Sequence, residues 1–113
     1  MNFKELARNL EMEEDEFLDM VKLFLETSAS DLTLLQGAQE KGEALKVGKA
    51  AHSIKGAAAN LGLMEIFQLA KNIEMEAREN HLDRAQEEIR TLREKLNQIA
   101  ENLRGSRDSK RYK

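Results

Sequence analysis

Apolar side chains recur along this chain at the three- and four-residue spacing of amphipathic α-helices, and no stretch alternates in the way that favours a β-strand. The pattern predicts one short helix and four longer ones, over about 3–10, 13–41, 43–61, 64–79 and 83–103. Gly42 and Gly62 stand where two of these helices should end, as left-handed caps. The fold class is therefore expected to be all-α, as an antiparallel up-down-up-down four-helix bundle with a short N-terminal capping helix.

The composition supports this expectation and removes several kinds of site. The chain has 113 residues, enough for one domain, and it contains no proline, cysteine or tryptophan. Without cysteine there is no disulfide framework, no thiolate nucleophile and no cysteine-based metal site. No segment resembles a signal peptide or reaches the length of a membrane span, so we expect a soluble cytoplasmic protein.

The charge is distributed unevenly along the chain. The expected bundle domain covers residues 1–104, and residues 105–113 have no apolar period, which predicts a flexible basic tail. The formal net charge is −3, but the tail holds four basic residues and one aspartate. Removing them leaves 14 basic and 20 acidic residues, a net charge near −6. An acidic body argues against nucleic acid or an anionic membrane as the partner.

One histidine lies on the outward side of the third predicted helix. At about 100° per residue, the apolar residues of this helix gather on one side, and His52 falls roughly 140° from its centre. These apolar residues are Val47, Ala51, Ile54, Ala58 and Leu61. His52 should therefore face away from the core.

Small residues and lysines surround this histidine on the outward face. The small residues are Gly48, Gly56 and Ala59, and the lysines are Lys49 and Lys55, three residues to either side of His52. A glycine inside a helix costs about 1 kcal/mol relative to alanine. Two such glycines beside one histidine predict a cleared surface on which another molecule docks.

His52 allows two interpretations from its position alone. The first is a solvated surface side chain in a helical adaptor that binds a partner helix. The second is a nucleophile, because an exposed imidazole is partly neutral near pH 7 and the lysines could hold the oxygens of a phosphoryl group. A metal site is not expected, since His81 is the only other histidine and should lie far from His52. No Ser-His-Asp set and no glycine-rich nucleotide loop can be identified.

Residues 52–62 read H-S-I-K-G-A-A-A-N-L-G, which resembles the signature H-x-x-K-G-x-x-x-x-L-G of histidine phosphotransfer (HPt) domains. The resemblance extends over about residues 3–103 in the order of helices. It implies that His52 accepts a phosphoryl group, that Lys55 supplies positive charge and that Gly56 gives a partner access. It also implies that Glu74, 22 residues further on, binds the other ring nitrogen. Many members have serine where this chain has Ala57.

The resemblance further implies a carrier in a phosphorelay rather than an enzyme with turnover of its own. Its partners would be response-regulator receiver domains and a hybrid sensor histidine kinase, and the protein would be a monomer. No cofactor is expected on this chain, because the magnesium ion and the accepting carboxylate would belong to the receiver. The phosphoacceptor domain of a chemotaxis-type kinase would share this chemistry but needs kinase domains after it.

Overall fold

A computed structural model describes the backbone of residues 1–111 and the side chains of residues 1–106. The described chain is all-helical, as predicted, and contains no strand. The helices are α1 (Phe3–Asn9), α2 (Glu14–Glu40), α3 (Ala44–Leu61), α4 (Met64–Arg78) and α5 (Gln86–Arg111). None of the described helices is long and apolar enough to cross a membrane.

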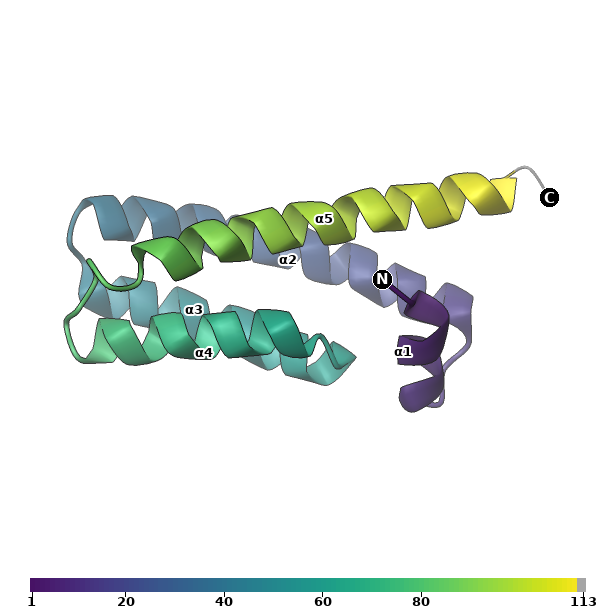
Figure 1. Ribbon diagram of the computed structural model, residues 1–113, viewed down its shortest axis with the longest axis horizontal. Helices are drawn as coiled ribbons and strands as arrows, with labels where there is room; N and C mark the ends of the chain where they lie inside the picture. Colours follow the sequence, from purple (N-terminus) through teal and green to yellow (C-terminus); the bar gives the residue numbers. More distant parts are fainter. Residues whose placement is uncertain (112–113) are drawn as a thin grey trace.

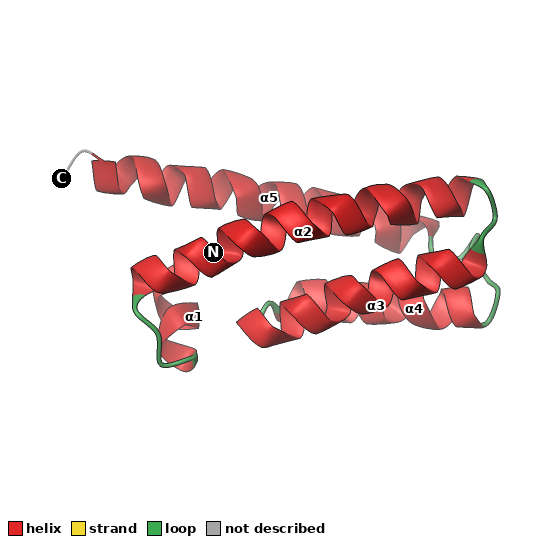
Figure 2. Ribbon diagram, turned by 180° about the vertical axis from the view of Figure 1, so that it is seen from behind, coloured by secondary structure: helices red, strands yellow, loops and turns green. Residues whose placement is uncertain are grey.

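The four longer helices lie alongside one another, with short turns between consecutive helices (Figures 1 and 2). Helix α3 packs against both α2 and α4, and α5 contacts α4 and α2. The short α1 packs against α2, where the rings of Phe3 and Phe17 have centroids 6.4 Å apart. The most extensive packing joins α3 and α4.

The apolar side of α3 faces the core as the sequence predicts. All five of its residues are at most 3% exposed, namely Val47, Ala51, Ile54, Ala58 and Leu61. The valine, isoleucine and leucine side chains among them each stabilise the fold by roughly 1.5–3 kcal/mol through removal of apolar surface from water. This burial fixes the rotation of α3 about its axis and turns His52 outward.

Both predicted glycine caps have the left-handed backbone that suits glycine. Gly42 has φ of 72° and Gly62 has φ of 73°. After Gly62, the backbone N–H of Leu63 donates to the carbonyl of Ala58 at 3.0 Å, and the Leu63 side chain is buried. This hydrogen bond and apolar contact are typical of the Schellman motif. The tight turn starts α4 directly beside α3.

The bounds of α5 differ from the prediction at both ends. The helix begins at Gln86 because residues 82–85 form turns, in which the backbone N–H of Arg84 donates to the carbonyl of His81 at 3.0 Å. At the other end the backbone stays helical to Arg111, eight residues beyond the predicted helix end at Leu103. Helix propagation adds one hydrogen bond per residue without needing an apolar period, and no proline interrupts it. Residues 112 and 113 of the predicted tail lie outside the described part.

Candidate functional site

His52 stands on the exposed face of α3 and is tied to α4 by one ring nitrogen. Its side chain is 63% exposed, and its Nδ1 lies 2.9 Å from Oε2 of Glu74. The predicted pairing of His52 with Glu74 is therefore present in the structure. Because Nδ1 is engaged by Glu74, Nε2 is the ring nitrogen left for another molecule.

Glu74 is the buried centre of a small charged network. Only 4% of its side chain is exposed, and three side chains bind its carboxylate. Lys55 Nζ donates to Oε1 at 2.7 Å, and an Arg78 guanidinium nitrogen donates to Oε2 at 2.6 Å, beside the His52 contact. Both carboxylate oxygens are thus satisfied, and the side chain is held in one orientation.

This network settles which nitrogen of His52 carries the proton in the neutral ring. An ionised carboxylate can only accept hydrogen bonds, so Nδ1 must be the donor to Glu74. The second nitrogen, Nε2, then carries the lone pair. A carboxylate that accepts from one imidazole nitrogen also stabilises the positive ring that forms when the other nitrogen is modified.

The surroundings of Glu74 keep it ionised in spite of its burial. Burial alone would raise the pKa of Glu74, but hydrogen bonds from Lys55 and His52 and the positive charges of Lys55 and Arg78 outweigh it. The net result is a pKa of Glu74 below its ordinary value of 4.5. The carboxylate is therefore negatively charged at neutral pH.

This lowered pKa has a consequence for stability in acid. A carboxyl group with a lower pKa in the folded than in the unfolded chain stabilises the fold above pH 4.5 and loses that contribution as pH falls through its folded pKa. We expect the Glu74→Gln variant to lose less stability than the wild type between pH 6 and pH 3, roughly the range over which carboxylates titrate. Urea unfolding at several pH values measures this, and parallel curves for the two proteins would contradict it.

Gly48 is not the exposed docking residue that the sequence predicts. It is buried, and a Cβ atom added to it would lie 3.7 Å from Cβ of Ala77 on α4. A distance of 3.7 Å is an ordinary van der Waals contact, so a methyl group at Gly48 would fit against Ala77. Gly48 thus lies at the contact between α3 and α4, and together with Ala77 it lines the open hollow beside His52.

The other small residues and Lys49 lie on the surface as expected. Gly56, Ala59 and Lys49 are all exposed, and a Cβ atom at Gly56 would meet nothing within 4 Å. On the side of His52 toward the start of α3, an open hollow of about 640 Å³ is lined in part by Lys49 and Arg78. The ring of His52 therefore stands beside open space and basic side chains.

Arg78 is the site residue that the sequence analysis did not find. It follows Glu74 by one helical turn, a spacing at which opposite charges meet on a helix face. That spacing is common on solvated helices, so the sequence could not separate this pair from the other Glu/Arg pairs of the chain. The structure distinguishes it because Arg78 shares the Glu74 oxygen that binds His52.

His81 belongs to a different part of the molecule. It lies in the α4–α5 connection, where its Nδ1 is 3.5 Å from Glu79 and 3.8 Å from Glu76. Within residues 1–106, no group of three histidine, aspartate or glutamate side chains is arranged to hold a metal ion.

Comparison with known proteins identifies one family and one similar solved structure. The family described as "Hpt domain" matches residues 19–102, which include His52, Lys55 and Glu74. The structure of histidine-containing phosphotransfer protein B (HptB) from Pseudomonas aeruginosa PAO1 is similar, with a TM-score of 0.82 and 27% sequence identity. The alignment covers 96% of this chain and 95% of that one. No curated protein sequence matches the chain.

Proposed function

The chain belongs to the Hpt domain family, whose role is histidine phosphotransfer in two-component signalling, and we propose that His52 is its phosphoacceptor. The observation that carries this proposal is the hydrogen bond from His52 Nδ1 to the buried Glu74. It leaves Nε2 unblocked on a side chain that is 63% exposed. A nucleophile needs such a free, oriented lone pair.

The transfer proceeds by exchange of one bond to phosphorus for another. The lone pair of His52 Nε2 attacks the phosphorus of an aspartyl phosphate on a receiver domain. The P–N bond forms as the P–O bond to the aspartate breaks, and the carboxylate leaves with the electron pair. The proton on Nδ1 stays on the ring, which becomes an imidazolium bearing the phosphoryl group. Attack by a second receiver's aspartate on the same phosphorus reverses these steps and returns the neutral imidazole.

Glu74 and Lys55 assist this exchange in different ways. Glu74 keeps the ring oriented and offsets the positive charge that develops on it, because its carboxylate accepts from Nδ1 throughout. Lys55, which has a quarter of its side chain exposed, lies one turn beyond His52 on α3 and supplies positive charge toward the phosphoryl oxygens. Phosphoryl transfer depends mainly on such positioning and charge neutralisation.

The same proposal describes the protein as a carrier with no turnover and no ATP site of its own. Consecutive long helices joined by short turns support the up-down-up-down bundle as its scaffold. Its partners are response-regulator receiver domains and a hybrid sensor histidine kinase, with no nucleic acid or membrane involved. It acts as a cytoplasmic monomer without a cofactor, and the magnesium ion needed for transfer is bound by the receiver.

The test is transfer from an isolated receiver domain that has been charged with acetyl phosphate. The protein is then digested at alkaline pH, where phosphohistidine survives, and the peptides are analysed by mass spectrometry. The proposal expects one phosphoryl group on the peptide that contains His52. A phosphoryl group on the peptide with His81, or no phosphorylation by any receiver tried, would overturn it and favour the adaptor interpretation.

A further inference from the structure

The helix that carries His52 differs in charge from the rest of the chain. Helix α3 contains three lysines, Lys46, Lys49 and Lys55, and no acidic residue. The whole chain nevertheless has a net charge of −3, so the remainder is near −6. The neighbouring α2 shows the contrast most clearly, because it has seven acidic residues and one lysine.

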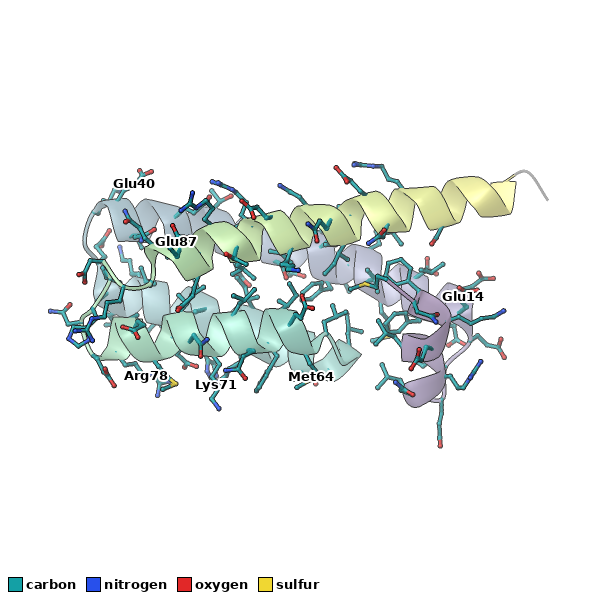
Figure 3. All side chains as sticks on the ribbon, viewed as in Figure 1. Glu14, Glu40, Met64, Lys71, Arg78 and Glu87 are labelled. Carbon is teal, nitrogen blue, oxygen red and sulfur yellow. The ribbon has the colours of Figure 1, made fainter. Side chains whose placement is uncertain are left out.

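Helical spacing places four basic residues on the faces of α3 and α4 that adjoin at His52 and Glu74. On α3, Lys49 and Lys55 are three residues before and after His52. On α4, Lys71 and Arg78 are three residues before and four after Glu74, which places them on the same side of the helix as Glu74. Figure 3 shows Lys71 and Arg78 along one edge of α4.

These charges are only partly neutralised within the protein. Glu74 is buried and contributes one negative charge, which Lys55 and Arg78 share. Lys49 and Lys71 are exposed, and neither forms an ion pair within 4.0 Å with any side chain that the structure describes. On the α2 side, Asp31 accepts a hydrogen bond from Ser53 at 2.7 Å and adds one negative charge. The face around His52 therefore keeps an excess of positive charge.

We propose that Lys49, Lys55, Lys71 and Arg78 form a cationic collar around His52 that docks an acidic partner surface. The inference rests on the proposed function, because the partner's transfer site must itself be negative. A phosphoryl group on a carboxylate carries close to two negative charges at neutral pH. The domain is otherwise acidic, so the positive charges around His52 attract the phosphorylated aspartate of the receiver toward Nε2.

Exposed charges of this kind act mainly on association. Steering between complementary surfaces raises association rates by about 10- to 1,000-fold and weakens as salt rises, because the Debye length is about 10 Å at 0.1 M ionic strength. Mutation of a charge at the rim of an interface changes the association rate and its salt dependence more than the chemistry. The collar should therefore change the receiver concentration that gives half the maximal transfer rate, here called KM. It should change the maximal transfer rate itself, here called kcat, much less.

The experiment compares two variants with the same change in net charge. Lys71→Glu reverses a collar charge, whereas Lys46→Glu reverses a lysine on α3 outside the collar, 70% exposed and paired with Glu43. Transfer from an isolated receiver domain charged with acetyl phosphate is followed at 50 mM and 200 mM NaCl, respectively below and above roughly physiological ionic strength. The receiver chosen is one that phosphorylates the wild-type protein, so a failure of transfer itself is detected separately.

The collar predicts a rise in KM of about three- to tenfold for Lys71→Glu at 50 mM NaCl, with a much smaller change in kcat. This difference from wild type should shrink at 200 mM NaCl, while Lys46→Glu stays within twofold of wild type, about 0.4 kcal/mol. Equal effects of the two substitutions, or a wild-type KM that does not change with salt, would overturn the collar. Either result would leave phosphorylation of His52 itself in place.

Discussion

Replacing His52 with glutamine should abolish acceptance of a phosphoryl group from a charged receiver, with the transfer rate reduced by more than about 1,000-fold. The glutamine amide has no nitrogen lone pair comparable to that of imidazole Nε2. Its amide N–H can still donate a hydrogen bond to Glu74, which keeps a partner for that carboxylate at position 52. The loss should therefore come from the missing nucleophile and not from unfolding, and circular dichroism with thermal melting checks the fold.

The control for this substitution is His81→Gln. His81 lies in the α4–α5 connection and has no part in the proposed transfer. The His81→Gln variant should accept the phosphoryl group at the wild-type rate. Acid-labile, base-stable phosphate on the His52→Gln protein would contradict the assignment of His52, whatever the His81 variant does.

Replacing Gly56 with glutamine should weaken docking of the receiver while the protein becomes slightly more stable. Gly56 is exposed and follows His52 by one helical turn, and a Cβ atom there meets nothing within 4 Å. Glutamine therefore fits the fold, and its better helix propensity should raise stability by roughly 0.5–1 kcal/mol. The longer side chain occupies the exposed surface of α3 on which the receiver would dock. We therefore expect KM for the receiver to rise at least about tenfold, or about 1.4 kcal/mol.

Two companion variants identify the cause. Gly56→Ala adds one methyl group and should show a similar gain in thermal stability with little change in KM. Gly56→Glu has the size of glutamine with a negative charge beside the collar, so its KM should exceed that of Gly56→Gln at low salt. A Gly56→Gln protein with wild-type transfer kinetics would show that the open surface at this position is not used by the partner.

The helices and the buried side of α3 could be predicted because they depend on local patterns. The apolar spacing predicted that Val47, Ile54 and Leu61 face the core. The glycines at positions 42 and 62 predicted where two helices end. The end of α5 could not be predicted in this way. A helix continues wherever each new residue can add a backbone hydrogen bond, so the loss of an apolar period after Leu103 did not mark its end.

The site was only partly predictable because its details depend on the distance between two helices. The outward position of His52 follows from the helical period, and the pairing with Glu74 was implied by the family signature. The burial of Gly48 depends on the approach of Ala77 from α4, a tertiary contact with no sequence signal of its own. The role of Arg78 likewise appears only once Glu74 is known to be buried beneath it.

The central claim is that Nε2 of His52 receives the phosphoryl group while Nδ1 stays bound to Glu74. Nuclear magnetic resonance of the ¹⁵N-labelled, phosphorylated protein tests it most directly, because coupling to ³¹P identifies the nitrogen in the P–N bond. The account predicts phosphorus coupling at Nε2 of His52 and a retained proton on Nδ1. Phosphorus coupling at Nδ1, or at either nitrogen of His81, would contradict it.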